Sequence, residues 1–364
     1  MTAGDTNFMM RCLELAQRGS RWVAPNPMVG CVIVRNGEVV GEGYHPAFGR
    51  PHAEIIALSQ AGKRAKGGTL YVNLEPCVHT GKTPPCTKAI IGAGISQVIA
   101  ATTDPNPLVS GGGFRDLRRA GIEVRSGLLR SQARLLNEKF FGFMEEGRPF
   151  VGVKIAQTLD GRIADLRGRS QWISSPISRT YGHDLRTQYH AVLVGAETVR
   201  RDNPELTVRH VRGRQPIRVV LDGKLSVPVT RKIFHSREAA TILLTSAATL
   251  RRQERKVILL ERRGVQVLGI EGPSMISGKV ITRVLAGLGI TSILVEGGSE
   301  TVGTFFEEKL VDRVHCIVAP SILGSGTTGF AFSHRTLATV VGLRNPWMGR
   351  IGNDLLIEGK PDFS

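Results

Sequence analysis

The sequence predicts an α/β protein of two domains, and three observations support this prediction. The chain has 364 residues, which is long for a single hydrophobic core. Strand-like apolar runs alternate with helical patterns along both halves of the chain, as they do in α/β proteins. Turn-forming residues at 146–149 interrupt this alternation, so we expect one domain over residues 1–147 and a second over residues 148–364.

In the first half, apolar side chains at helical spacing predict a helix over residues 5–18. A buried strand is expected at 29–34, and Asn36-Gly37 predicts a hairpin into a second strand at 38–43. The remaining elements of this half are expected in the following order: a helix that begins near 52, a strand at 68–74, a helix at 87–93, a strand at 96–102, a short helix through 117, a strand near 122–124 and a helix over 131–145.

The second half begins with a strand predicted at 150–157. Further strands are expected at 191–194, 217–221, 241–244, 256–260, 265–268, 292–295 and 313–318, with helical patterns between some of them. Neither half has Gly-x-Gly-x-x-Gly after a strand, so the sequence does not indicate a Rossmann dinucleotide domain.

Composition narrows the class of protein. The five cysteines are odd in number and spread out, which is unlike a disulfide framework and favours a reducing, cytoplasmic compartment. No run reaches the length of a membrane span, so we expect no membrane association and no targeting segment. The net charge of +17 is scattered and aromatic residues make up only 5%, which favours anionic small molecules over nucleic acid as partners.

The strongest chemical signal lies between residues 52 and 86. His52, Cys77 and Cys86 supply one imidazole and two thiolates, which leaves the fourth position of a tetrahedral zinc ion for water, as in catalytic zinc sites. Glu54 can move the protons of that water if His52 lies where a helix begins, and Pro51 fits such a position. The pattern matches the zinc-deaminase signature, except that eight residues separate the cysteines where the signature has two.

Each of these signals has a simpler alternative. The two cysteines and the histidine can be core residues or a structural metal clip, although three ligands and an acid at motif spacing argue against chance. Taken alone, Asn26 and His45 are explained by a turn and a surface loop. The glycines after the strand at 292–295 suit a phosphate at a helix N-terminus, but an ordinary strand-to-helix turn explains them equally well.

The whole chain resembles the bifunctional riboflavin-biosynthesis deaminase/reductase family. The resemblance rests on these motifs: Pro25-Asn26-Pro27-x-Val29-Gly30, the zinc motif with its Thr83-Pro84-Pro85-Cys86 insert, Asp104-Pro105-Asn106-Pro107, Lys154-x-Ala156-x-x-Leu159-Asp160-Gly161, Ser170-Gln171-Trp172-Ile173, Thr198-Val199, Asp202-x-Pro204-x-Leu206-Thr207-Val208-Arg209 and Val295-Glu296-Gly297-Gly298. They cover the chain nearly end to end, and the insert length makes the match specific.

The resemblance implies a cytidine-deaminase-like N-terminal domain and a dihydrofolate-reductase-like C-terminal domain. It implies Zn²⁺ and NADPH as cofactors and a phosphorylated pyrimidine as substrate. The first reaction would be hydrolytic deamination of 2,5-diamino-6-(5-phosphoribosylamino)pyrimidin-4(3H)-one. The second would be reduction of the ribosyl group to ribityl phosphate. We expect a homo-oligomer that binds neither nucleic acid nor membrane.

The resemblance also assigns roles to residues of this chain. In the first half it supports Glu54 as the catalytic proton carrier and His52, Cys77 and Cys86 as zinc ligands, and it implies deaminase substrate contacts at Asn26, His45, Lys82 and Thr83. In the second half it implies cofactor contacts at Ala156, Trp172, Thr198, Asp202, Gly298, Ser299, Glu300, Thr301, Val302, Gly303 and Thr304. It implies reductase substrate contacts at Ser170, Arg186, Leu206, Arg209 and Glu296.

Two alternative functions stay open from the sequence. An RNA base deaminase with an appended RNA-binding domain would suit the positive charge, and it would show salt-sensitive RNA binding and no NADPH binding. The long insert and the scarcity of aromatic residues argue against it. A non-catalytic scaffold clipped by zinc would unfold on chelation and would turn nothing over.

Overall fold

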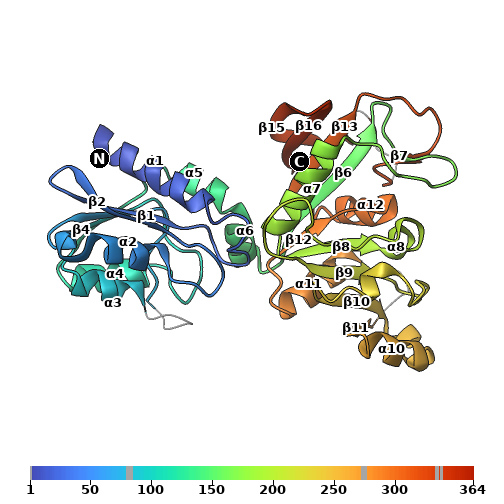
Figure 1. The fold of residues 1–364 in the computed structure, drawn as a ribbon, viewed down its shortest axis with the longest axis horizontal. Helices are drawn as coiled ribbons and strands as arrows, with labels where there is room; N and C mark the ends of the chain where they lie inside the picture. Colours follow the sequence, from blue (N-terminus) through green and yellow to red (C-terminus); the bar gives the residue numbers. More distant parts are fainter. Residues whose placement is uncertain (1, 79–84, 272–276, 333–335, 337–338) are drawn as a thin grey trace. The chain divides into compact units, whose positions relative to one another are not determined.

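The computed structural model describes residues 2–78, 85–271, 277–332, 336 and 339–364. The chain divides into two compact units, Met1–Gly147 and Arg148–Ser364, which we call the N-terminal and C-terminal units (Figure 1). Each unit is built on its own β-sheet with helices packed against it, so the predicted α/β class is confirmed. Within the described ranges, no helix combines the length and the apolar character needed to cross a membrane.

The N-terminal unit contains a five-stranded sheet of order β2-β1-β3-β4-β5. Its strands are β1 (Gly30–Arg35), β2 (Glu38–Tyr44), β3 (Thr69–Val72), β4 (Gln97–Ala100) and β5 (Glu123–Ser126). β1 is antiparallel to both of its neighbours, whereas β3, β4 and β5 run parallel to one another. The carboxyl ends of β3 and β4 therefore lie at one edge, where the loops after them meet.

Helices cover both faces of this sheet. They are α1 (Ala3–Gln17), α2 (Ala53–Ala61), α3 (Cys86–Gly92), α4 (Gly112–Arg119), α5 (Arg130–Leu136) and α6 (Glu138–Glu146), with a 3-10 turn at Gly62–Ala65. Strand β1 alternates, with Cys31 and Ile33 in the core under α2, α3 and α4, and Val32 and Val34 in the core under α1 and α5 (Figure 1). This two-sided burial explains why the strand is apolar throughout.

Helix α2 lies unusually close to β2. A Cβ atom at Gly43 would come within 2.4 Å of the Ala53 carbonyl oxygen, and one at Gly41 within 2.3 Å of the Ala57 carbonyl oxygen. Only glycine permits this approach of helix backbone to strand backbone. The first turn of α2, which carries two of the predicted site residues, is fixed against the sheet in this way.

The helix predicted over 131–145 is interrupted at Asn137, which separates α5 from α6. The Asn137 side chain accepts a hydrogen bond from the Met28 N–H at 2.8 Å and donates one to the Met28 carbonyl oxygen at 2.9 Å. A side chain that bonds to backbone elsewhere competes with helix geometry at its own position. The single-helix prediction was wrong because nothing in the local pattern reveals this distant partner.

The C-terminal unit contains a nine-stranded sheet of order β11-β10-β9-β8-β12-β6-β13-β16-β15. Its strands are β6 (Phe150–Thr158), β8 (Ala191–Gly195), β9 (Ile217–Leu221), β10 (Thr241–Ser246), β11 (Val265–Ile270), β12 (Ser292–Val295), β13 (Arg313–Ala319), β15 (Gly342–Ile351) and β16 (Asp354–Asp362). From β11 to β13 all neighbours are parallel, and β16 and β15 join antiparallel. A two-stranded ladder pairs β7 (Arg162–Ala164) with β14 (Thr327–Thr328).

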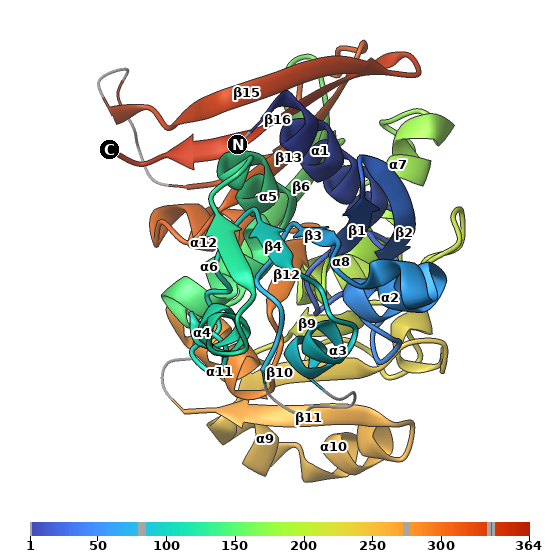
Figure 2. The same ribbon diagram turned by 90° about the vertical axis from the view of Figure 1, so that its left-hand side faces the viewer.

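The helices of this unit are α7 (Pro176–Gln188), α8 (Ala196–Asp202), α9 (Ala247–Arg252), α10 (Glu254–Glu261), α11 (Gly278–Gly287) and α12 (Ser299–Glu307), with a 3-10 turn at Lys232–Phe234. Helices α11 and α12 contribute to the core on one face of the sheet, and α8 and α10 contribute to the core on the other. Helices α9 and α10 pack beside β11 (Figure 2). Strands β8 and β12 are neighbours, so the turns that lead from them into α8 and α12 lie side by side.

Two sequence predictions for this unit were wrong or incomplete. Residues 256–260, predicted as a strand, belong to helix α10, in which Val257 and Leu260 are buried one turn apart. The apolar run Val257-Ile258-Leu259-Leu260 is too short for periodicity to separate a strand from a helix. The long hairpin of β15 and β16 was not predicted, because Pro346 and a register shift between Arg344 and Trp347 obscure the strand pattern of β15.

Asp312 anchors the beginning of β6. Its carboxylate accepts two hydrogen bonds from the Arg148 guanidinium, both at 2.8 Å, and one from the Val151 N–H at 2.8 Å. We expect Asp312→Ala to lower the free energy of unfolding of the C-terminal unit by about 2–4 kcal/mol, because it removes the carboxylate that accepts three hydrogen bonds from a partly buried guanidinium and a strand amide.

Urea unfolding combined with hydrogen exchange of the β6 amides measures this effect. The matched control is Glu271→Ala, which removes the exposed ion pair with Arg251 and should leave the unfolding midpoint unchanged. An unchanged midpoint in Asp312→Ala would contradict the anchoring role.

Candidate active sites

The predicted metal ligands converge in the N-terminal unit. His52 is the residue that caps the start of α2, Cys77 follows β3, and Cys86 is the first residue of α3. The His52 Nδ1 atom lies 3.3 Å from the Cys86 sulfur and 3.6 Å from the Cys77 sulfur. All three ligand atoms lie within 4.8 Å of one another.

This spacing fits a tetrahedral zinc ion. Bonds of about 2.0–2.1 Å to nitrogen and about 2.3 Å to sulfur place such ligand atoms roughly 3.6–3.8 Å apart. Within the part of the chain that the structure describes, His52, Cys77 and Cys86 are the only members of the group, so a zinc ion there would keep one position for water. Among the described residues, this donor set is of the kind that catalytic zinc sites use.

The charges of the cluster favour a thiolate. The Cys86 thiol and the Cys86 backbone N–H, at 3.4 Å, both direct hydrogen bonds to the Cys77 sulfur, and they lower the pKa of Cys77 well below its ordinary value. The hydrogen bond with that sulfur raises the pKa of His52. Cys77 lies at the N-terminal turn of α3, where backbone N–H groups favour negative charge.

Glu54 lies in the first turn of α2 and is 4% exposed. Burial, and next to it the negative charge at Cys77, raises the pKa of this carboxyl. Cys77, His52 and Cys86 all influence this pKa, so the carboxyl lies beside the ligand cluster. A carboxyl with a raised pKa next to a water position is suited to take up and release a proton.

His45 and Asn26 form a pair next to the cluster. The His45 Nδ1 atom lies 3.1 Å from the Pro51 carbonyl oxygen, which can only accept, so Nδ1 carries the proton. The other ring nitrogen, Nε2, then accepts from the Asn26 side-chain amide at 3.2 Å. Burial lowers the pKa of His45, in agreement with a neutral ring. The His45 and His52 rings are 5.4 Å apart and perpendicular, which places this pair at the metal cluster.

Sequence reasoning missed two asparagines that hold the backbone of this segment. Asn73, which is fully buried, accepts from the Gly30 N–H at 2.8 Å and donates to the Met28 carbonyl oxygen at 2.9 Å. With Asn137 on the other side, two asparagines fix the backbone that carries Asn26. Two of the predicted substrate contacts, Lys82 and Thr83, lie outside the described residues.

Glu75 is a second residue that sequence reasoning did not single out for a role. It is 3% exposed, and its carboxylate accepts hydrogen bonds from the backbone N–H groups of Asp104, Gly111 and Phe114 at 3.0–3.1 Å. These bonds tie the loop after β4 to the residues that lead into Cys77. The available signal in the sequence was an acidic residue that directly follows a strand pattern and lies two positions before Cys77. If such a carboxylate is buried, it needs several hydrogen-bond donors.

In the C-terminal unit, Arg186 of α7 and Glu296 after β12 form a buried ion pair. The Arg186 Nε and Nη2 atoms donate to the two Glu296 oxygens at 2.5 and 2.8 Å, and Nη1 donates to the Thr207 carbonyl oxygen at 3.0 Å. Burial alone would raise the pKa of Glu296, but the Arg186 charge outweighs it and holds this pKa below its ordinary value. Burial lowers the pKa of Lys154 on β6, whose ammonium is attracted to the same carboxylate.

The two neighbouring strand-to-helix turns form a cradle of backbone. Gly297 and Gly298 have φ of +137° and +74°, which L-residues rarely adopt. A Cβ atom at Gly195 would lie 2.6 Å from the Thr301 hydroxyl, and one at Gly297 would lie 3.6 Å from the Thr198 hydroxyl. The cradle therefore combines bare backbone, two hydroxyls and the N-terminus of α12, which suits the phosphates of a dinucleotide.

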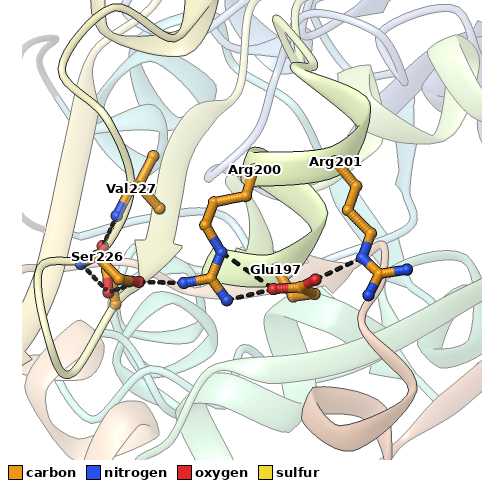
Figure 3. A network of polar contacts seen from close by, with 6 residues as sticks. Glu197, Arg200, Arg201, Ser226 and Val227 are labelled. Carbon is orange, nitrogen blue, oxygen red and sulfur yellow. Dashed lines mark hydrogen bonds and ion pairs between the residues drawn. The ribbon is translucent and has the colours of Figure 1, made fainter. Parts of the chain in front are cut away.

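Helix α8, which carries Thr198 and Asp202, is held on both sides. Asp202 accepts from the Ser170 hydroxyl at 3.0 Å, and burial raises the pKa of Asp202. On the exposed side, Glu197 pairs with Arg200 and Arg201, and Arg200 donates to Ser226, as Figure 3 shows. Such exposed pairs add little stability and mainly fix geometry.

The other predicted contacts of the C-terminal unit are more dispersed. Trp172 is exposed and stacks under the Arg179 guanidinium at 4.4 Å. Ala156 lies on β6 opposite Ile317. Arg209 pairs with Glu205, and Leu206 is buried with φ of +54°.

Helix α12 contains six of the predicted cofactor contacts: Ser299, Glu300, Thr301, Val302, Gly303 and Thr304. Val302 faces the core, and Gly303 packs against the Ala331 backbone, so both lie on the buried side of the helix.

His183 is a buried residue near the Arg186 ion pair that the sequence pattern did not reveal. Its Nδ1 atom accepts from the Arg209 backbone N–H at 3.1 Å, and its ring lies 4.4 Å from the His210 ring. Burial, and next to it the Arg186 charge, lowers the pKa of His183 to about 3. A neutral His183 therefore fixes the segment that carries Arg209.

Fold, geometry and family matches together define the class: a zinc-binding deaminase domain followed by a RibD-type reductase domain. Residues 3–102 match the family model described as the cytidine and deoxycytidylate deaminase zinc-binding region. Residues 149–357 match the model of the RibD C-terminal domain.

Relatives cover the whole chain. The riboflavin biosynthesis protein RibD of Aquifex aeolicus is 45% identical over 97% of both chains, and that of Escherichia coli is 41% identical over 89% of this chain and 90% of its own. The solved structure of Acinetobacter baumannii RibD (form 1) has a TM-score of 0.90, 36% identity and 99% coverage of both chains.

A Thermotoga maritima structure has a TM-score of 0.84, 39% identity and 99% coverage of both chains. It is described as a diaminohydroxyphosphoribosylaminopyrimidine deaminase/5-amino-6-(5-phosphoribosylamino)uracil reductase. The chain belongs to the RibD family, the bifunctional deaminase/reductases of riboflavin biosynthesis. The prediction of this family from the sequence is confirmed, in preference to an RNA base deaminase.

The lowered pKa of His183 has a consequence for stability. In the unfolded chain this group titrates near 6.5, whereas in the folded unit its pKa is about 3. Its contribution to folding is therefore complete above pH 6.5 and is lost as the pH falls from 6.5 towards 3. We expect His183→Asn, whose amide oxygen can accept from the Arg209 N–H, to flatten the stability profile of the C-terminal unit in this window.

The measurement is urea unfolding of wild type and variant at several pH values. The control is His235→Asn, at an exposed histidine, which should leave the profile unchanged. Profiles of equal slope for wild type and His183→Asn would contradict a neutral buried His183.

Proposed function

We propose that the N-terminal unit binds Zn²⁺ through His52, Cys77 and Cys86 and that Glu54 is its proton carrier. One observation carries this proposal: three ligand atoms of a catalytic donor set lie within 4.8 Å of one another, beside a buried carboxyl with a raised pKa. The substrate we propose is 2,5-diamino-6-(5-phosphoribosylamino)pyrimidin-4(3H)-one, on the basis of the Thermotoga maritima relative. We propose reduction of the ribosyl group with NADPH as the second reaction.

In deamination, zinc would polarise a water molecule for attack on the ring carbon that bears the amino group. Glu54 takes a proton from that water, delivers it to a ring nitrogen and then helps to protonate the departing ammonia. Its burial supports this sequence, because a carboxyl with a raised pKa holds the proton between the two transfers. One side chain thus serves first as base and then as acid.

Asn26 and His45 are proposed to orient the pyrimidine. The neutral His45 ring engages the amide NH₂ of Asn26, which leaves the Asn26 oxygen to accept from an amino group of the substrate. Asn73 and Asn137 hold the backbone of this segment, so the acceptor is fixed before the substrate arrives. We assign Lys82 and Thr83 to substrate contact on the family resemblance.

In the reductase unit, a reduced nicotinamide would supply hydride to C1 of the open-chain sugar. The cradle of Gly297, Gly298, Thr198 and Thr301 is proposed to hold the cofactor phosphates, with further cofactor contacts at Ala156, Trp172, Asp202 and the first turns of α12. For the substrate we propose contacts at Ser170, Arg186, Leu206, Arg209 and Glu296. The exposed part of Arg209 suits the substrate phosphate.

We further propose that the protein acts in the cytoplasm and as a homo-oligomer. The described cysteines are all free, which suits a reducing compartment.

Glu54→Gln keeps the size of the side chain but cannot carry the proton. We expect the rate of ammonia release to fall by at least about 100-fold, because general acid and base catalysis contributes that much or more. The zinc content and the rate of NADPH oxidation with the deaminated substrate should match wild type. Near wild-type deamination by a fully zinc-loaded variant would refute the role given to Glu54.

Gly298→Ala tests the cradle. The substitution places a side chain at φ of +74° and 3.2 Å from the Thr301 hydroxyl, so the turn must shift. We expect the Kd for NADPH to rise by about tenfold or more, measured by fluorescence titration, while deamination stays unchanged.

The matched control is Gly289→Ala, which has the same φ of +74° in the same unit but open space around the new Cβ. It imposes the same backbone strain away from the cradle and should leave the Kd unchanged. Equal Kd values for the two variants would show that the turn does not contact the cofactor.

A further inference from the structure

A cavity lies in the C-terminal unit, at the opposite edge of the sheet from the cradle. It has a volume of about 420 Å³, and its lining includes Arg218, Arg237, Glu261, Arg262 and Arg263. Strands β9, β10 and β11 begin at this edge, whereas the cradle follows the carboxyl ends of β8 and β12. All these strands are parallel, so the cavity is separate from the proposed cofactor site.

Arg218 carries an unusual buried charge. It lies on β9 and is 1% exposed. Its Nη atoms donate to the carbonyl oxygens of Glu205, Ser236 and Ala239 at 2.6–3.2 Å. Its Nε atom is buried and has no hydrogen-bond partner. A purely structural role explains the Nη bonds but leaves this donor, which belongs to a side chain that lines the cavity, without an acceptor.

No carboxylate forms an ion pair with Arg218 among the residues that the structure describes. Glu205 accepts a hydrogen bond from Arg218 through its backbone carbonyl oxygen, whereas its carboxylate forms an ion pair with Arg209. Burial lowers the pKa of Arg218 to about 10, and the charges of Glu238 and Glu205 offset this only in part. A buried cation without a counter-charge is unfavourable, and an anion in the cavity would supply the missing partner.

The rest of the lining points to the same kind of ligand. Arg237 and Arg262 are exposed at the cavity, and Arg263 is fixed there by its contact with His235 at 2.7 Å. The lining thus includes four arginines and one acidic residue, Glu261. Arginine binds phosphate oxygens through paired N–H groups, more specifically than it binds chloride or a single acceptor.

The size and the apolar part of the cavity set the ligand class. A volume of about 420 Å³ exceeds what inorganic phosphate needs and lies within the range of small-molecule sites. Ile233, Phe234 and Val265 give the cavity an apolar wall beside the arginines. We propose that this cavity binds a phosphorylated small molecule of about mononucleotide size, with its phosphate on the arginines.

This inference does not rest on the proposed function of either unit. The full chain, loaded with zinc and saturated with NADPH, is titrated with AMP as the probe, and the Arg218 Nε–H signal is followed by nitrogen NMR. Adenosine and inorganic phosphate serve as comparison ligands. We expect the Arg218 signal to shift with AMP, to stay in place with adenosine, and to respond to inorganic phosphate only at higher concentrations.

The variant Arg237→Ala/Arg262→Ala removes two exposed guanidinium groups from the lining and leaves Arg218 intact. We expect it to weaken AMP binding by about tenfold or more. The matched control, Arg252→Ala/Arg255→Ala, removes the same charge from exposed positions outside the lining and should stay within about twofold of wild type. The Arg218 signal in the absence of AMP reports that each variant is folded.

Several outcomes would overturn the proposal. An Arg218 signal that AMP does not move would show that no ligand reaches the cavity. Equal weakening in the two double variants would assign the effect to overall charge, and no weakening in either would exclude Arg237 and Arg262 as ligands and refute the proposed phosphate contacts. Equal affinity for adenosine and AMP, or for inorganic phosphate and AMP, would refute the assigned ligand class.

Discussion

The N-terminal unit depends on the close approach of helix α2 to strand β2. Bare backbone at Gly41 and Gly43 lets the helix lie against the sheet, and this fixes where its first turn begins. His52 directly precedes that turn and Glu54 lies within it, so one packing contact sets the direction of a proposed metal ligand and of the proposed proton carrier together. Cys86 joins them because α3 also begins at this edge.

The C-terminal unit also positions its candidate site residues through glycines at the edge of a sheet, but in a different sheet. Its two central strands, β8 and β12, end next to each other, and glycines in the turns after them leave backbone open to a ligand. The ion pair of Arg186 and Glu296 lies at the same edge. Two hydrogen bonds hold its charged groups in place. Both units thus place polar groups at strand ends and apolar groups within the sheet.

The sequence allowed the fold class, most strands and the grouping of His52, Cys77 and Cys86 to be predicted, because these features follow a short period or a fixed spacing. The residues that support the sites could not be predicted in this way. Asn73, Asn137 and His183 are single polar residues whose partners are far away in the chain. The hairpin of β15 and β16 had a usable signal in Gly352-Asn353, the two-residue connection between its strands, but Pro346 concealed it.

The hydrogen bonds between Asn137 and Met28 make the segment around Asn26 dependent on the last helices of the N-terminal unit. The matched deaminase region ends at residue 102. The backbone next to Asn26 nevertheless forms hydrogen bonds with Asn137, which lies 35 positions beyond that end. During synthesis on the ribosome, His52, Cys77 and Cys86 emerge well before Asn137. The proposed zinc ligands are therefore available early, whereas the segment proposed to orient the pyrimidine gains its second asparagine contact only when the nascent chain has passed the junction of α5 and α6.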